Sequence, residues 1–144
     1  MKLIRAFQVA FTLILLVVAV AGCSNTPVSP SSAPFSQTDL RVGSGTAAVT
    51  GSTVTVQYTG WFYDASKADK RGVQFDTSIG RTALTFTLGA GSVVQGWEQG
   101  LVGMNVGGLR RLIIPPSMAY GPNRDSAIPP NATLVFDIEL LDVQ

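Results

Sequence analysis

One short stretch, residues 91–101, constrains the fold more than any other part of the sequence. Ser92 and Gln95 fit a capping box at the start of a helix. The apolar residues of the stretch recur at helical spacing, as Val93, Trp97 and Leu101. After an N-terminal leader, the other apolar residues alternate at period two, so this one helix must cover one sheet. Such a sheet has to curl and leave a concave mouth, and we expect Trp97 at its floor.

Three segments alternate apolar and polar residues, namely 53–58, 84–88 and 134–141. This pattern predicts antiparallel strands with one apolar face and one wet face. A further strand is predicted at 109–114, after a Gly-Gly turn, and we interpret its Arg110-Arg111 pair as a solvated edge. The predicted fold class is α+β, a curled antiparallel half-barrel sheet of five to six strands wrapped around one short helix.

Two stretches lack this alternation. Residues 61–74 contain Asp, Ser, Lys and Gly, which predicts a bulged or looped excursion between strands. Residues 115–131 carry five of the eight prolines of the chain, which predicts a stiff loop with little capacity for sheet pairing. A loop of this length in a compact domain is more often functional than idle.

The composition excludes several kinds of chemistry. The chain has no histidine, which removes Ser/His and Cys/His nucleophile pairs and histidine metal sites, so we expect neither a metal nor a cofactor. Lys2 and Arg5 lie in the leader, which leaves eight of the ten basic residues against nine acidic ones. This balance argues against nucleic acid as a partner.

The N-terminus has the features of a secretory leader. A cationic start precedes an apolar run at 6–21, and Val20-Ala21-Gly22-Cys23 resembles the bacterial lipobox, in which cleavage precedes the cysteine. An uncleaved membrane anchor and a merely buried thiol are the alternatives. The lipobox resemblance implies that Cys23 carries diacylglycerol and an N-acyl chain such as palmitate. It places the protein in the bacterial cell envelope, on the outer membrane or the outer face of the plasma membrane.

The predicted organisation follows from these boundaries. Residues 1–22 form a lipoprotein signal peptide, and residues 23–37 form the lipidated cysteine with a Ser/Pro-rich tether. Residues 38–144 form one domain, which we expect to be monomeric.

Five ordered blocks in this domain resemble the FKBP-type peptidyl-prolyl cis-trans isomerases. They are Tyr58-Thr59-Gly60, Phe75-Asp76-Thr77-Ser78, Val93-Val94-Gln95-Gly96-Trp97-Glu98, Ala119-Tyr120-Gly121 and Ile128-Pro129-Pro130-Asn131-Ala132-Thr133-Leu134-Val135-Phe136. The resemblance covers about residues 38–143. It implies an isomerase that acts on X-Pro bonds of exported polypeptides without a cofactor, with macrolide inhibitors as further ligands.

The resemblance also implies a proline pocket. Trp97 would form its floor and Asp76 the polar group at its rim, while the Val94 amide and the Tyr120 hydroxyl would bind ligand carbonyls. The walls would be Tyr58, Phe75, Val93, Val94, Tyr120, Ile128 and Phe136. Arg81, Leu84 and Ala127 would form a secondary rim, where Leu84 and Ala127 depart from the residues common in the family.

Other interpretations of the same residues remain open. The aromatic residues could be ordinary core residues, and Asp76 could only cap a turn or pair with Arg81. The domain could be a proline-peptide-binding chaperone or adaptor that uses the same pocket without turnover. It could also be a structural envelope lipoprotein.

Overall fold

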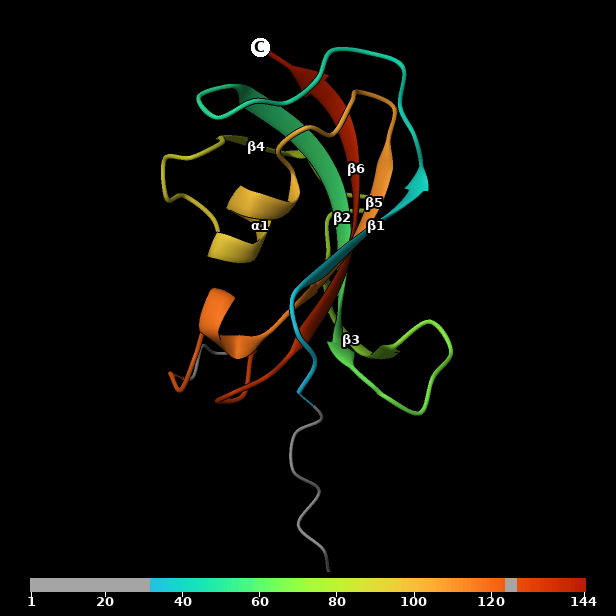
Figure 1. Ribbon diagram of the computed structural model, residues 1–144, viewed down its shortest axis with the longest axis vertical. Helices are drawn as coiled ribbons and strands as arrows, with labels where there is room; N and C mark the ends of the chain where they lie inside the picture. Colours follow the sequence, from blue (N-terminus) through green and yellow to red (C-terminus); the bar gives the residue numbers. More distant parts are fainter. Residues whose placement is uncertain (1–31, 124–126) are drawn as a thin grey trace, which may run out of the picture.

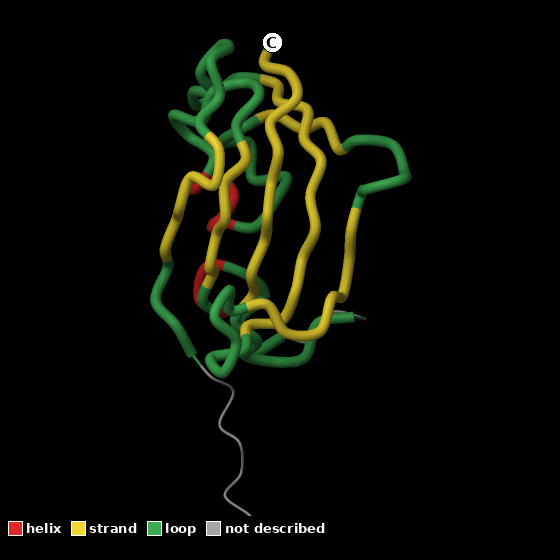
Figure 2. The backbone as a smooth tube through the Cα atoms, turned by 90° about the vertical axis from the view of Figure 1, so that its right-hand side faces the viewer, coloured by secondary structure: helices red, strands yellow, loops and turns green. Residues whose placement is uncertain are grey.

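The computed structural model describes residues 32–123 and 127–144, which form one curled sheet with a short helix on its concave face (Figure 1). In chain order the elements are β1 (Ser36–Arg41), β2 (Thr53–Tyr63), β3 (Arg71–Thr77), β4 (Leu84–Thr87), α1 (Gln95–Gly100), β5 (Leu109–Ile114), η1 (Pro116–Met118) and β6 (Leu134–Val143). The described strands are all antiparallel, in the order β1-β5-β6-β2-β3, and β4 also pairs with β2 (Figure 2). The predicted fold class is confirmed.

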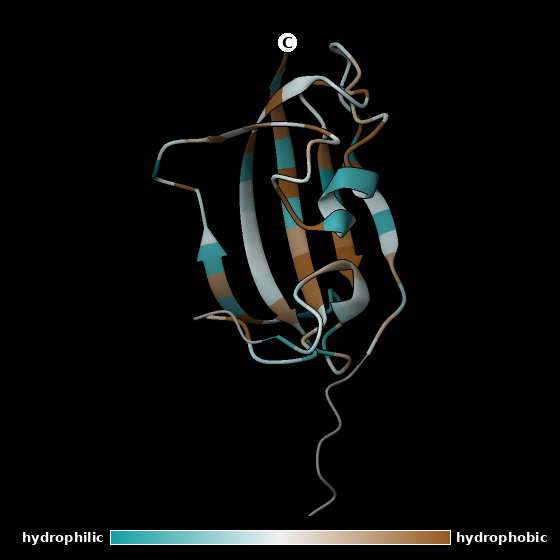
Figure 3. Cartoon of the chain, turned by 90° about the vertical axis from the view of Figure 1, so that its left-hand side faces the viewer, coloured by the Kyte–Doolittle hydropathy of each residue, from teal (hydrophilic) through white to brown (hydrophobic). Residues whose placement is uncertain are grey.

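Alternation along the two long central strands produces the core. In β6, Leu134, Phe136, Ile138 and Leu140 are buried, and in β2 Val54 and Val56 are buried on the same side. Figure 3 shows α1 lying across these apolar strands. Trp97 of the helix and Leu101, its C-cap residue, join the same buried cluster, so one helix covers one sheet as the sequence predicted.

Two glycines let α1 approach the sheet closely. A Cβ atom at Gly96 would lie 2.5 Å from the Ile114 side chain, and one at Gly100 would lie 2.6 Å from Leu112. Each glycine costs about 1 kcal/mol in helix propensity relative to alanine. A six-residue helix with two glycines is therefore held by its packing on β5 rather than by its own hydrogen bonds.

The start of the helix differs from the prediction. The N-cap residue is Val94, and no side chain caps the helix, so the predicted capping box of Ser92 and Gln95 is wrong. The carboxylate of Glu98 instead accepts hydrogen bonds from the amides of Gly89 and Gly91. Glu98, in the first turn of the helix, thus ties the preceding turn to α1.

Half of the bulged or looped excursion predicted at 61–74 is sheet. Its first three residues continue β2 to Tyr63, and its last four belong to β3, which leaves 64–70 as the loop. Register shifts beside Trp61 interrupt the β2–β3 ladder, which explains why the segment lacks simple alternation. Residues 115–131 contain η1 and no strand in their described part, as the prolines predicted.

Arg110 and Arg111 do not lie on an edge, because β5 runs between β1 and β6. The interpretation as a solvated edge is therefore wrong. Arg110 is 7% exposed, and its guanidinium contacts Asp39 on β1 and the Gly100 carbonyl. The side-chain hydrogen bond from Arg110, opposed by burial, lowers the pKa of Asp39.

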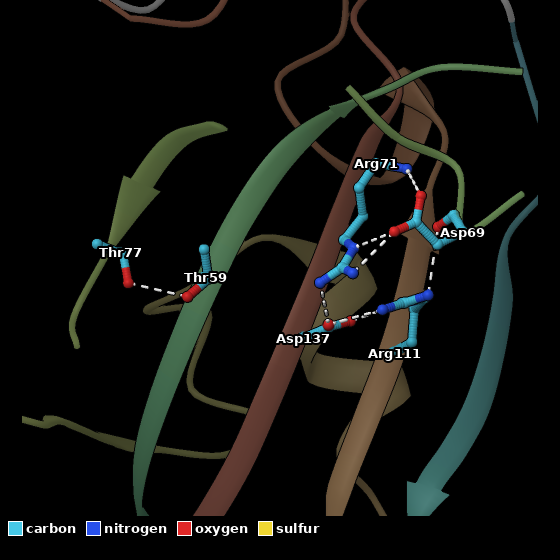
Figure 4. A network of polar contacts seen from close by, with 6 residues as sticks. All are labelled: Thr59, Asp69, Arg71, Thr77, Arg111 and Asp137. Carbon is cyan, nitrogen blue, oxygen red and sulfur yellow. Dashed lines mark hydrogen bonds and ion pairs between the residues drawn. The ribbon is translucent and has the colours of Figure 1, made fainter. Parts of the chain in front are cut away.

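Arg111 belongs to an ion network on the convex face of the sheet (Figure 4). Its guanidinium donates to both carboxylate oxygens of Asp137 at 2.6 and 2.7 Å, and it also donates to the Asp69 carbonyl oxygen. Arg71 bridges Asp69 and Asp137 and lies 4.8 Å from the Trp61 ring centroid. The network therefore fastens the 64–70 loop to β5 and β6.

The leader, Cys23 and most of the predicted tether lie outside the described residues. Ser36 and Gln37, assigned to the tether from the sequence, form the start of β1 and pair with Ile113 and Leu112. The folded part thus begins slightly before the predicted boundary at residue 38. Among the described residues, none of the helices has the length and apolar character needed to span a bilayer.

Asp137→Ala should lower the free energy of unfolding by about 2 to 3 kcal/mol, because it removes the carboxylate partner of a largely buried arginine. Arg111 and Asp137 have side chains only 17% and 14% exposed. Glu139→Ala is the matched control on the same face of β6. Its pair with Arg41 is far more exposed, so its loss should cost less than about 1 kcal/mol. Urea unfolding measures both, and equal losses would contradict this role of the network.

Candidate active site

A hollow of about 170 Å³, lined by aromatic, aliphatic and polar side chains, opens between α1, the sheet and the loop after β5. We call it the proline hollow, after the pocket that the sequence resemblance predicts here. An apolar cavity of about 150 Å³ can hold benzene, so this volume is sufficient for a five-membered pyrrolidine ring. It is lined by Tyr58, Phe75, Asp76, Leu84, Ser92, Val93, Val94, Trp97, Tyr120 and Phe136.

The base of the hollow is an edge-to-face cluster of aromatic rings. The Trp97 ring lies 5.1 Å from Tyr58 and 5.2 Å from Phe136 between centroids, at 76° and 89°. Trp97 and Phe136 are only 4% and 5% exposed, whereas Tyr120 and Leu84 are each 37% exposed. The tryptophan therefore lies deep in the hollow, and Tyr120 and Leu84 lie at its opening.

The indole Nε1 of Trp97 is buried and has no hydrogen-bond acceptor in the described part of the chain. An unpaired buried donor costs about 1 to 3 kcal/mol. The ring is therefore held by packing against Tyr58, Phe86 and Phe136 rather than by a polar contact.

Gly60 makes room for the aromatic wall, although it was not among the predicted site residues. A Cβ atom at this position would lie 2.7 Å from the Phe75 ring and 2.8 Å from the Phe136 ring. These two rings meet edge to face at 5.6 Å and 88°. The sequence places Gly60 beside Tyr58 in a strand, and an isolated strand glycine is the signal of such a close approach.

Asp76 is the polar group at the rim. One carboxylate oxygen accepts the Tyr58 hydroxyl at 2.6 Å, and the other accepts Arg81 at 2.7 Å and the Thr77 amide at 2.8 Å. Burial raises the pKa of Asp76, but these hydrogen bonds outweigh burial and leave it below its usual value. The carboxylate is therefore ionised at neutral pH and orients the Tyr58 hydroxyl.

The segment before α1 forms the remaining wall. Ser92, Val93 and Val94 line the hollow directly after the turn that Glu98 holds at Gly89 and Gly91. The sequence pattern predicted Ser92 as part of a helix cap and indicated no separate role for Glu98. Their positions follow from the geometry of the turn, in which both glycines have positive φ angles of 89° and 74°.

The structure brings most of the predicted site residues together, with two exceptions. Ile128 is buried in the core at 4% exposure and does not line the proline hollow. Ala127 is exposed and does not line this hollow. Leu84 lines it, and Arg81 lines an adjoining hollow of about 290 Å³ that shares Tyr58 and Leu84 with it. The aromatic and valine wall residues, Trp97 and Asp76 all line the proline hollow.

The lining is suited to binding and desolvating an uncharged group. Its titratable groups are one ionised carboxylate and two phenols, and the Tyr58 hydroxyl donates to that carboxylate. Within residues 32–123 and 127–144, no three carboxylate or cysteine side chains come together in a way that could hold a metal ion. The site fits a reaction in which a bond rotates and none is broken.

Comparison with known proteins agrees with this geometry. The family model of the FKBP-type peptidyl-prolyl cis-trans isomerase matches residues 44–141. The FK506-binding protein of Neisseria meningitidis serogroup B is 47% identical over 107 residues, which are 73% of this chain and 92% of that protein.

Solved structures have the same fold. FkpA from Escherichia coli superposes with a TM-score of 0.65 at 39% identity, over 84% of this chain and 53% of that one. AtFKBP13 superposes with a TM-score of 0.63 at 34% identity, over 76% of this chain and 93% of that one.

Ultraviolet titration should find one phenol that ionises far above the usual value. Burial, with the hydrogen bond to Asp76, raises the pKa of Tyr58 to about 12. Because the pKa of Tyr58 is higher in the folded than in the unfolded chain, the protonated phenol stabilises the fold. This stabilisation is fully present below the unfolded pKa of about 10 and is lost as the pH rises towards 12. The difference titration between wild type and Tyr58→Phe isolates this phenol. Asp76→Asn should lower its pKa, and a Tyr58 midpoint near 10 in the wild type would contradict the buried hydrogen bond.

Proposed function

The chain belongs to the FKBP-type peptidyl-prolyl cis-trans isomerase family, and from this premise we propose that it isomerises X-Pro bonds of exported proteins from a membrane-tethered position. The observation that carries the assignment of the site is the proline hollow, an aromatic-lined space of about 170 Å³ with Trp97 at its base. The residues that line this hollow act as a binding surface for the twisted peptide bond.

The barrier to rotation explains why such a surface is sufficient. An X-Pro bond must lose amide resonance as it twists, which contributes to a barrier of about 18 to 20 kcal/mol. The planar amide carries partial charges on oxygen and nitrogen that water solvates well. Moving the bond into the proline hollow removes this solvation, and shape complementarity to the twisted form adds to the effect. About 5 to 6 kcal/mol of differential binding gives roughly a 10⁴-fold rate increase.

Two polar groups orient the substrate in this proposal. Val94 is the N-cap residue of α1, and the first N–H groups of a helix have no acceptor within the helix. Its amide therefore donates to a substrate carbonyl beside the bound ring. The Tyr120 hydroxyl, at the opening of the hollow, donates to a second carbonyl. Macrolides of the FK506 type would occupy the same hollow as competitive inhibitors.

Trp97→Leu should lower kcat/KM for an X-Pro peptide by about tenfold or more, which corresponds to at least ~1.4 kcal/mol of transition-state stabilisation. Phe136→Ala should lower it similarly, and Asp76→Ala should lower it less. Trp61→Leu is the matched control, because Trp61 is stacked with Arg71 of the convex-face network and does not line the hollow.

The assay is isomer exchange of the peptide by NMR with the full chain in detergent. Circular dichroism first establishes that each variant is folded, since truncating the buried Phe136 costs about 3 to 5 kcal/mol. Equal rates for wild type and a folded Trp97→Leu variant would contradict the site. Saturable binding of the peptide without acceleration would favour the alternative of a non-catalytic binding module.

The tether is supported by the sequence pattern at the N-terminus. The leader ends in Val20-Ala21-Gly22-Cys23, and the following Ser/Pro-rich segment would separate the domain from the lipid. Two acyl chains hold a protein on a membrane, because each buried CH₂ contributes about 0.8 kcal/mol. The proposed location is the outer membrane or the outer face of the plasma membrane of a bacterium, with the domain in the periplasm or exterior.

Cys23→Ser should abolish lipid attachment. In a bacterial host fed radiolabelled palmitate, the wild-type protein should be labelled and sediment with membranes. The variant should be unlabelled and retain its leader, which shows as a higher mass. An unlabelled wild-type protein of unprocessed mass would contradict the lipoprotein proposal and favour an uncleaved anchor.

A further inference from the structure

We propose that a second hollow beside the proline hollow is a subsite for an acidic side chain on the residue adjoining the substrate proline. This second hollow has a volume of about 290 Å³ and is lined by Tyr58, Ser78, Arg81, Thr82, Ala83 and Leu84. The proposal rests on the proposed function, because it concerns the flanking residue of the same X-Pro substrate.

The two hollows are neighbours that share a wall. Tyr58 and Leu84 line both of them. An extended peptide advances about 3.3 Å per residue. When its proline occupies the first hollow, an adjoining residue therefore lies close to the shared wall and can direct its side chain into the second hollow.

The two residues of the ion pair at the rim line different hollows. Arg81 donates to Asp76 at 2.7 Å, yet Asp76 lines only the proline hollow and Arg81 lines only the second. Of the described residues that line the second hollow, Arg81 alone carries a charge. The peptide side chain that enters it therefore meets the Arg81 guanidinium, whereas Asp76 belongs to the lining of the other hollow.

Arg81 keeps the capacity to bind a second carboxylate. A guanidinium has five N–H donors in a planar fork, and the ion pair with Asp76 uses one terminal nitrogen. The Arg81 side chain is 63% exposed, so its remaining donors face solvent and can bind a ligand without breaking the pair. Ala83 and Leu84 offer apolar contact to the methylene groups of a glutamate. A lysine in the same place would be repelled.

Peptides that differ only at the residues adjoining proline test this inference. Glutamate, glutamine or lysine is placed before the proline in one series and after it in another, and NMR exchange gives kcat/KM with the full chain. In at least one series the wild type should prefer glutamate over glutamine by about 3- to 5-fold, the size expected of a partly exposed ion pair. The preference should shrink as the salt concentration rises.

Arg81→Gln should make the glutamate and glutamine peptides equal, and the ratio within one variant cancels any general loss of activity. Lys67→Gln, which removes an exposed cation of the 64–70 loop, should keep the wild-type ratio. Equal rates for the glutamate and glutamine peptides in both wild-type series would overturn the subsite while leaving the isomerase function intact. A glutamate preference that survives in Arg81→Gln would overturn the subsite in the same way. Failure to accelerate any of the peptides would overturn the proposed function itself, and the subsite with it.

Discussion

The close approach of α1 to β5 is the constraint on which the rest of the structure depends. Gly96 and Gly100 present no side chain to Ile114 and Leu112, so the helix lies directly on the sheet and carries Trp97 into the concavity. The helix is only six residues long and cannot cover the whole concave face. The uncovered part, with the indole at its base, is the proline hollow. The site thus exists because the short helix leaves part of the concave face uncovered.

The two faces of the sheet have different tasks. On the concave side, Tyr58, Phe75 and Phe136 meet edge to face and form an apolar wall. On the convex side, a row of paired residues crosses the strands behind that wall, as Arg111, Asp137, Thr59 and Thr77 (Figure 4). Because neighbours in a strand point to opposite faces, ordering this row also fixes the backbone beneath Phe136, Tyr58 and Asp76. The paired polar residues on the convex face therefore help to hold the aromatic wall on the concave face in place.

The sequence predicted the parts of the fold that depend on periodicity. Apolar alternation identified β4, β6 and the first half of β2, the Gly-Gly turn that precedes β5 indicated that strand, and helical spacing found α1. The sequence did not predict β3, because register shifts at Trp61 remove the alternation. Arg110 was predicted to lie on an edge because a local sequence pattern does not determine the order of strands in the sheet. The aromatic residues of the site were predicted from the order of the motifs. Glu98 acts through hydrogen bonds to the backbone of the preceding turn, which no local pattern indicates. The strand glycine at Gly60 does signal a close approach, but not that the rings of Phe75 and Phe136 fill the space.

The central claim is that a proline ring enters the hollow above Trp97. A Trp61→Phe variant leaves Trp97 as the single tryptophan of the chain, which makes its fluorescence a direct reporter of the hollow. Titration with an X-Pro peptide should change this emission saturably, whereas the matched X-Ala peptide should leave it unchanged. If the variant isomerises the X-Pro peptide while its emission stays constant at saturating peptide, the proline binds elsewhere and the claim is wrong.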